Sequence, residues 1–276
     1  MITKLTNRTP FNNFTDKCFS SLLTLTPLII LNVFLFFFIT PLQAKTISTL
    51  TKEVFSELHQ CDKKFEYDIY FFNRKVGYLH RKIKWYNSET TTKATVTSYG
   101  EVSFLWLEST YQQKSSMQYS FQYHHFLTPR FSQKLTGIKS REMEADIADN
   151  GLSSTVTLNN EVSHYQHKGE NKNQALYDID TLGAQIRLNL LQGKTRFKLS
   201  RQASNKIENY QFEVAGNEAI IHDKWGKLTA IKVIEIGEHE NMVLWFSSKH
   251  DHQLIKAELD MVFSPIVWLS HFSQQC

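Results

Sequence analysis

The sequence predicts a mainly β protein: a curved antiparallel sheet or partly open barrel, with one internal helix and a short N-terminal helix. From Phe65 onward, segment after segment alternates apolar and polar residues with a period of two, as half-buried strands do. A single later segment, 177–193, has the helical period instead. The chain also holds 20 Phe and 11 Tyr, residue types that suit a pleated surface.

Residues 1–44 are predicted to be a secretory signal peptide. A loosely basic start precedes the uncharged apolar run 21–40, and PLQA then places Leu42 and Ala44 at the −3 and −1 positions of a cleavage site. The alternative is an uncleaved membrane anchor, because the run is close to the ~20 residues that span a bilayer. The proline after the run and the small cleavage residue favour removal. A single β-rich periplasmic domain, residues 45–276, would remain.

The elements follow one another in chain order. The segment 45–60 has apolar residues at helical spacing and predicts the short N-terminal helix. KFEYDIYFF then starts the period-two pattern, and further extended segments continue it as far as the polar stretch 168–175. Asn150-Gly151 is the strongest hairpin signal, because both residues tolerate positive φ. Strands return after residue 193, and no proline between Pro129 and Pro265 forbids central ones.

The segment 177–193 predicts a helix of about three to four turns. Asp178 or Asp180 can cap its start, and Gly193 can end it. We expect this helix to fill the concave side of the sheet or to plug its open end. A sheet of so many antiparallel strands has to close or curl around another element, because unpaired edge strands would otherwise be exposed. The predicted apolar stripe of the helix consists of Ile179, Leu182, Ile186 and Leu190.

Two cysteines, Cys61 and Cys276, lie beyond the predicted leader. An oxidising compartment permits them to form a disulfide that would tie the start of the domain to its last residue. The alternative is a pair of free thiols, one of them on a frayed terminus.

Three stretches make the sequence resemble the exported bacterial family called domain of unknown function 3108. FEYDIYFFNRKVGYLHRKI is similar to the family's opening hairpin, and YDIDTLGAQIRLNLL to its central Asp-rich helix start. KLTAIKVIEIGEHENMVLWFSSKHDHQLIKAELD is similar to its closing strands, although the family commonly has a proline where this chain has Leu254-Ile255. The resemblance spans about Phe65 to Asp260. It implies an exported β-rich protein and carries no catalytic residues over.

Aromatic residues are the main candidates for a ligand site. A curled sheet with an aromatic lining and few charges can hold an acyl chain or stack on sugars, although core packing also explains such residues. The candidates, chosen because they share strand faces, are Phe104, Trp106, Tyr119, Phe121, Tyr67 and Phe71.

His250-Asp251-His252 is the one motif that suggests a metal. If both histidines lay in a strand, their side chains would share a face. The polar cluster around them between two alternating runs predicts instead the polar, wet tip of a hairpin. The weak candidates for a third metal ligand are His239, Glu240, His222 and Asp223.

Other catalytic signals are missing from the sequence. It contains no G-x-S-x-G elbow and no glycine-rich phosphate loop. Asp178 and Asp180 are a possible acid/base pair, but their place at a helix start favours capping. Arg187, about two turns after Asp180, is expected to pair with a carboxylate from the sheet.

These observations predict an exported periplasmic protein, more an apolar-ligand binder than an enzyme, whose ligand is a lipid or a glycan. The alternatives are an interaction module of the envelope without a small-molecule site and, last, a metal-dependent hydrolase. We expect no cofactor. The formal net charge of +4 is too small to indicate a nucleic-acid surface. Membrane attachment is expected only through an uncleaved leader.

Overall fold

The computed structural model describes residues 61–87, 92–105, 107–137, 140–167, 175–237, 242–259 and 264–276. They all belong to one compact unit, Lys45–Cys276. The predicted leader and the predicted helix 45–60 lie outside the described residues. Among those described, no helix is long and apolar enough to cross a membrane.

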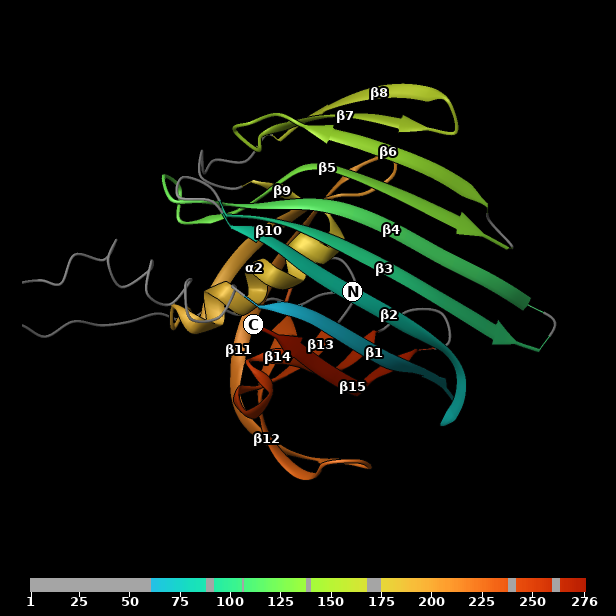
Figure 1. Ribbon diagram of the computed structural model, residues 1–276, viewed down its shortest axis with the longest axis vertical. Coiled ribbons are helices and arrows are strands. Elements are labelled where there is room, and N and C mark those ends of the chain that lie inside the picture. The colour runs from blue at the N-terminus through green and yellow to red at the C-terminus, as the bar shows by residue number, and fades with distance from the viewer. Residues whose placement is uncertain are drawn as a thin grey trace, which may run out of the picture. The chain divides into compact units, whose positions relative to one another are not determined.

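The described strands form one 15-stranded, open and curved sheet, which confirms the predicted fold class (Figure 1). Its order is a meander that starts at β8, descends to β1, passes to β15 and then descends again to β9. The first half consists of β1 (Asp62–Phe71), β2 (Arg74–Asn87), β3 (Thr92–Phe104), β4 (Leu107–Ser120), β5 (His125–Thr136), β6 (Arg141–Ile147), β7 (Ser153–Leu158) and β8 (Glu161–Gln166). The second half consists of β9 (Leu176–Tyr177), β10 (Arg196–Gln202), β11 (Ile207–His222), β12 (Gly226–Glu235), β13 (Met242–Ser247), β14 (Gln253–Leu259) and β15 (Ile266–Gln275).

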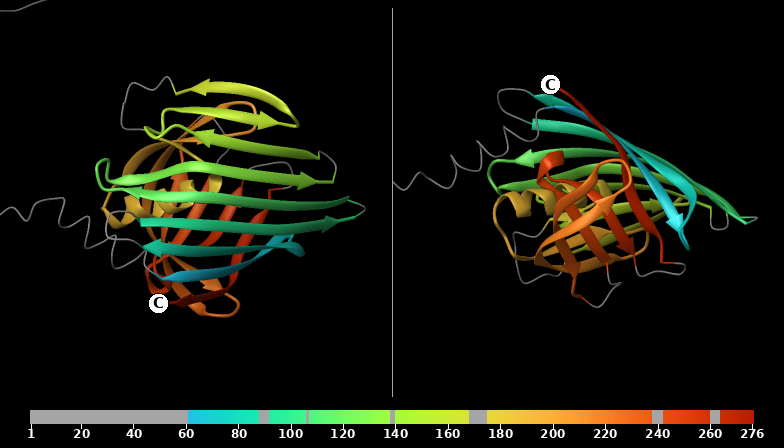
Figure 2. Two further views of the ribbon diagram at one scale, coloured as in Figure 1. Left: turned by 45° about the horizontal axis from the view of Figure 1, so that its top comes forward. Right: turned by 90° about the horizontal axis from the view of Figure 1, so that it is seen from below.

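The two halves of the sheet curl toward each other around helix α2 (Ile179–Leu191), as the views in Figures 1 and 2 show. The largest apolar core accordingly joins side chains of α2 to side chains of β2 through β5 on one side and of β10 through β14 on the other. The alternation seen in the sequence sets which side chains take part. In β1, Phe65 and Tyr67 are buried while the intervening Glu66 is exposed.

The seam between the two halves is covalently closed. β1 pairs with both β2 and β15, and Asp62 lies opposite Gln275 in the register with β15. Cys61 and Cys276, the residues just beyond that pair, form a disulfide with their Cα atoms 4.3 Å apart. The first and last described residues are therefore joined next to the strands that connect the two halves.

The two ends of the sheet meet where the β6–β7 hairpin, β7 and the residue after β8 contact β9 and β10. The Leu176 N–H donates to the Gly151 carbonyl at 2.8 Å, and Ser154 Oγ in β7 donates to Gln202 Oε1 at the end of β10 at 2.6 Å. His167 is hydrogen-bonded to Ser200 Oγ at 2.8 Å. These isolated hydrogen bonds hold the two ends of the sheet together, although no strand of one end pairs with a strand of the other.

Helix α2 has both of the predicted caps. Asp178 is the N-cap, with an extended backbone, and accepts from the N–H groups of Asp180 and Thr181. At the other end, Gly193 has a φ of +71°. The Gly193 and Lys194 N–H groups donate to the Leu190 and Asn189 carbonyls, which is a Schellman ending.

The hairpin turns of the structure match those predicted from the sequence only in part. Asn150-Gly151 does form the β6–β7 hairpin, but only Gly151 takes a positive φ, +72°. Two further hairpins use adjacent left-handed residues that the sequence analysis did not single out, Phe72-Asn73 and Asn159-Asn160. Asparagine tolerates this conformation, whereas the bulky Phe72 is a poor residue for it.

Candidate binding cavity

A partly open cavity of about 810 Å³ lies between the sheet and α2. This volume lies within the roughly 300–1,000 Å³ of small-molecule sites. Most of the wall is apolar and comes from both halves of the sheet and from the helix. Representative wall residues are Leu79 of β2, Val102 of β3, Leu182 of α2, Leu244 of β13 and Val267 of β15.

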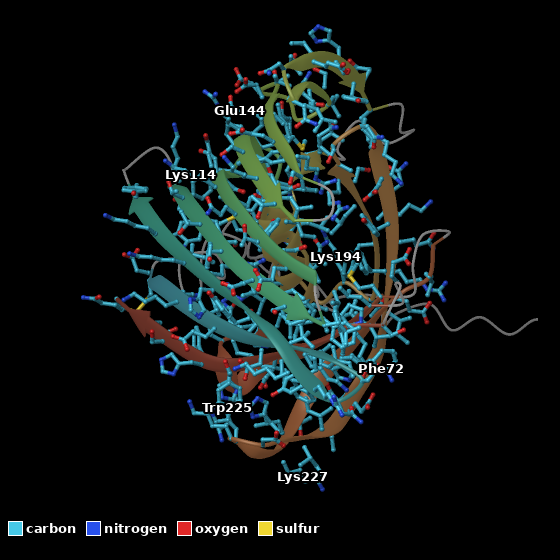
Figure 3. All side chains as sticks on the ribbon, turned by 90° about the vertical axis from the view of Figure 1, so that its right-hand side faces the viewer. Phe72, Lys114, Glu144, Lys194, Trp225 and Lys227 are labelled. Atoms are coloured by element: carbon cyan, nitrogen blue, oxygen red, sulfur yellow. A yellow bond between two sulfur atoms is a disulfide. The ribbon has the colours of Figure 1, made fainter. Side chains whose placement is uncertain are left out.

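One end of the cavity lies beside the turns that follow β1, β3 and β5. Ile69, Val102 and Leu135, all close to those turns, belong to the wall. Figure 3 views the unit from this side, with Phe72 of the β1–β2 turn labelled. Arg141 and Lys206 also line the cavity and give this region a polar border.

A buried carboxylate fixes the start of α2 to the first half of the sheet. Asp178 is fully buried, and the amide of Gln113 and the hydroxyls of Ser115, Thr128 and Thr181 all donate to it at 2.7–3.2 Å. Burial, followed by the neighbouring charge of Asp180, raises the pKa of Asp178, while donors from Thr181 act in the opposite direction. This arrangement is structural capping, the alternative that the sequence analysis favoured over acid/base chemistry.

The second carboxylate, Asp180, faces β2 through β4. It accepts from Ser98 Oγ at 3.0 Å and from Gln113 Nε2 at 2.9 Å. It also forms an ion pair with Arg81 of β2, at 2.7 Å between Nη2 and Oδ1. Arg81 and Asp180 both line the cavity, where they form a polar spot in the apolar wall.

The middle of α2 is tied to the β13–β14 turn by Arg187. Its carboxylate partner is Asp251, which lies in that turn and not in a strand of the sheet, where the sequence placed the expected partner. Arg187 Nη2 lies 2.8 Å from Asp251 Oδ1, and Arg187 Nε donates to the Asp251 carbonyl at 2.8 Å. Lys63 of β1 donates to the other Asp251 carboxylate oxygen. Burial, followed by the charge of Arg187, lowers the pKa of Lys63 to about 8, although the contact with Asp251 acts in the opposite direction.

His250 and His252 lie in the predicted turn. A short 3₁₀ helix, η1 (Ser248–His250), leads into Asp251 and His252, whose φ values are +56° and +50°. The expectation of a wet tip is wrong for part of this turn. Asp251 is held by Arg187 and Lys63, and the His250 ring lies 4.4 Å from that of Trp225.

Metal binding has little support in this region. Both ring nitrogens of His222 are engaged, one with the Leu269 carbonyl and the other with the Lys224 and Trp225 N–H groups. Asp223 is exposed, and residues 239 and 240 lie outside the described part. Across the described residues, no group of three or more His, Cys, Asp or Glu is placed to hold a metal ion.

The predicted aromatic candidates do not form one lining. Tyr67 belongs to the cavity wall. Tyr119 packs in the core against Phe126, and Phe121 is 40% exposed in the turn after β4. Phe71 and Phe104 contact each other edge to face at 5.6 Å between ring centroids, and residue 106 lies outside the described residues.

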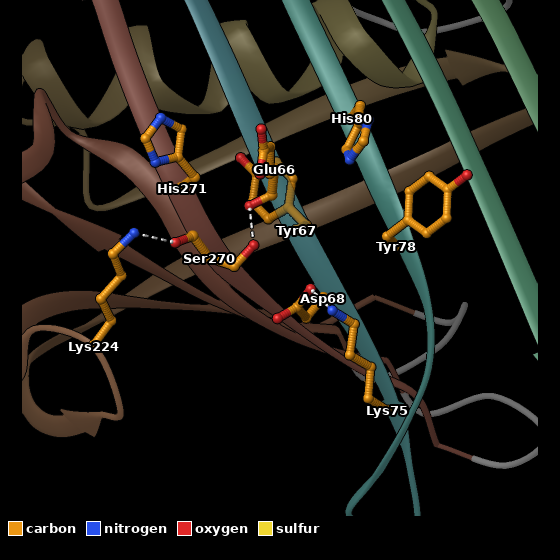
Figure 4. A pocket seen from close by; sticks show the side chains of 9 residues that line it. All are labelled: Glu66, Tyr67, Asp68, Lys75, Tyr78, His80, Lys224, Ser270 and His271. Atoms are coloured by element: carbon orange, nitrogen blue, oxygen red, sulfur yellow. Dashed lines mark hydrogen bonds and ion pairs between the residues drawn. The ribbon is translucent and has the colours of Figure 1, made fainter.

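A second hollow lies on the opposite face of β15, β1 and β2 (Figure 4). It holds about 500 Å³ and is bordered mainly by polar side chains, including Glu66, His80 and His271. Glu66 lies opposite both histidines in the strand register. The hollow is a shallow, water-facing surface, so the deeper cavity between the sheet and α2 is the better candidate for a binding site.

No protein-family model matches the chain, and no curated protein sequence matches it either. The resemblance to domain of unknown function 3108 therefore stays a prediction.

Proposed function

We propose that this chain is an exported envelope protein that binds the apolar chain of a lipid between its curved sheet and α2. The observation that carries the proposal is the cavity of about 810 Å³ with a mainly apolar wall. An acyl chain placed there would gain about 0.8 kcal/mol for each CH₂ group removed from water. The proposed periplasmic location rests on the predicted leader.

A lipid suits the wall better than a glycan does. Sugars need many hydrogen-bond partners in addition to stacking surfaces, because burying an unpaired hydroxyl is costly. Charged and polar side chains do line part of the wall, but many of them already bond to other protein groups. Asp180 is bonded to Ser98, Gln113 and Arg81, and Glu208 to Arg201 and Lys206. The aromatic side chain among the predicted ligand residues that does reach the cavity is Tyr67.

The test is whether the cavity takes up an apolar molecule. N-phenyl-1-naphthylamine, an uncharged fluorophore that brightens in apolar surroundings, would be titrated into protein freed of lipid. Ala184→Trp places an indole on the cavity-facing side of α2, whereas Ala148→Trp adds the same group to an exposed turn. We expect saturable binding to the wild type and to Ala148→Trp, and affinity at least about tenfold weaker for Ala184→Trp.

Equal binding by Ala184→Trp and the wild type would mean that the probe lies elsewhere, and it would overturn the proposal. Should Ala184→Trp not fold, Val102→Trp obstructs the cavity from β3 and serves the same comparison. Absence of binding to the wild type would equally rule the proposal out.

One observation favours the interaction-module alternative. β8 stands at the edge of the described sheet, pairs with β7, and is exposed at most positions. An open edge of this kind can accept a strand from a partner protein. That function would be favoured if the cavity bound no apolar probe and a Val162→Pro substitution in β8 abolished a complex formed in the envelope.

A further inference from the structure

We infer that the lipid is anionic and that Arg81 binds its carboxylate inside the cavity. This inference rests on the proposed function and adds the chemical class of the ligand. Arg81 projects from β2 into the space between sheet and helix, and it retains 18% side-chain exposure although it belongs to the cavity wall. A charged group with accessible surface in an apolar cavity is a natural point for orienting a ligand.

The internal contacts of Arg81 leave part of its guanidinium open. Nη2 forms the ion pair with Asp180 at 2.7 Å, and Nε is 3.4 Å from Ser98 Oγ. A guanidinium has further N–H donors arranged as a fork that matches a carboxylate. Within the described part of the chain, no acceptor lies on Nη1.

Helix α2 leaves room in front of that nitrogen. Gly183 faces Arg81, and a Cβ built on Gly183 would lie 3.9 Å from Arg81 Nη1 with no other contact within 4 Å. A glycine inside a helix costs about 1 kcal/mol relative to alanine. A methyl group here would rest on Arg81 Nη1 at van der Waals distance, and a larger side chain would cover that nitrogen. Both Gly183 and Arg81 line the cavity.

The other cations around the cavity already have carboxylate or amide partners. Arg187 and Lys63 contact Asp251, and Arg201 and Lys206 both contact Glu208. Arg141, on the border, donates to Gln133 Oε1 at 2.9 Å. Arg201 also has an open donor, because its buried Nε lacks a hydrogen-bond partner among the described residues. Arg81 differs from Arg201 in facing the gap that Gly183 leaves on α2.

Asp180 does not prevent a ligand carboxylate from binding. Its oxygens are saturated by Ser98, Gln113 and Arg81, and its side chain is only 1% exposed. The ligand charge would also lie near the first turn of α2, where the helix dipole favours an anion. A long-chain carboxylate therefore satisfies both the open donor and the apolar wall.

The experiment compares hexadecanoate with hexadecanol, which have the same chain but different head groups. Each would displace N-phenyl-1-naphthylamine from the wild type, from Arg81→Met combined with Asp180→Asn, and from Arg130→Met, a control at an exposed position outside the cavity. The double variant removes both members of the pair together, so that no lone charge stays buried. We expect the wild type and Arg130→Met to bind hexadecanoate at least about tenfold more tightly than hexadecanol, and the double variant to bind both alike.

Equal affinities in the wild type, or a preference that survives in the double variant, would overturn the role of Arg81 while the proposed apolar site stands. If the wild type binds neither the fluorophore nor either ligand, the proposed function fails as well. Gly183→Leu gives a second readout that leaves both charges in place. We expect it to weaken hexadecanoate binding more than hexadecanol binding, and an equal loss for both would count against the inference.

Discussion

At the scale of single residues, Asp178 links local helix capping to tertiary structure. The same carboxylate accepts from the backbone of α2 and from Gln113, Ser115 and Thr128 on β4 and β5. A cap that is only local is worth about 1 kcal/mol. The strand donors would lose their partner as well if this carboxylate were removed, and buried donors without a partner are costly.

We predict that Asp178→Ala lowers the free energy of unfolding by about 3 kcal/mol or more, because it removes the cap and leaves buried donors unsatisfied. Urea denaturation followed by circular dichroism measures the change. Asp149→Ala, at an exposed turn position, is the matched control and should change stability by less than about 0.5 kcal/mol. Equal effects of the two substitutions would mean that the Asp178 contacts do not stabilise the fold.

His125 provides a pH-dependent contribution to stability. It is buried, and its Nε2 atom has no hydrogen-bond partner in the described structure. Burial, opposed by a bond to the Tyr123 backbone, lowers its pKa from 6.5 to about 4. Between these values the unfolded chain binds a proton that the folded chain does not, so stability is lost as the pH falls from about 6.5 to about 4.

The expected size of this loss is up to about 3 kcal/mol. His125→Phe should remove that part of the pH dependence, because the substituted side chain does not titrate. His271→Phe, at an exposed position, should retain it. Urea midpoints at a series of pH values give the comparison, and identical pH profiles for the wild type and His125→Phe would show that His125 does not carry the effect.

At the scale of elements, the seam between β1 and β15 holds the two halves of the meander together. The strands are paired over most of their length, and the disulfide adds a covalent link between residues 215 positions apart. In the chain-entropy treatment, a loop of this length stabilises the folded state by about 5 kcal/mol, chiefly by restricting the unfolded chain.

Cys61→Ser combined with Cys276→Ser should therefore lower the thermal midpoint strongly while leaving the β-sheet circular dichroism spectrum unchanged at low temperature. Removing both cysteines together avoids a lone thiol. Scanning calorimetry of the double variant and of the reduced wild type should give matching midpoints. An unchanged midpoint in the double variant would show that strand pairing alone holds the seam.

The elements were largely predictable from sequence because strand and helix signals are local. Phe65 and Tyr67 on one face of β1, and Asp178 and Gly193 at the ends of α2, are visible as patterns and have the predicted positions. Asp251 as the partner of Arg187 was not predictable, since no local pattern connects residues 64 positions apart.

The polar side of the cavity had a signal that the sequence analysis missed. Ser98 follows Ala94 and Val96 on the inward face of β3, and Gln113 and Ser115 precede Met117 on that of β4. Polar residues at inward positions of an alternating strand indicate a buried partner. The partner that each of these residues contacts depends on the curvature of the sheet, which cannot be predicted from the sequence of any single strand.

At the scale of the whole described unit, the curled sheet leaves a space that α2 fills only in part. A core of this size would normally be packed without large voids. Leaving a cavity of about 810 Å³ unfilled therefore lowers the free energy of unfolding relative to a filled core. A binding function accounts for that cost, and this is why the cavity carries the functional proposal.

The most direct test of lipid binding is native mass spectrometry of the protein purified from its own cell envelope in a mild detergent. Wild type and Ala148→Trp should each carry a bound species in the mass range of a lipid, in a one-to-one ratio, and organic extraction should release it. Ala184→Trp, prepared in parallel, should carry little or none. A wild-type protein that is free of any bound species, or an Ala184→Trp variant that carries the same species in the same amount, would contradict lipid binding in the cavity.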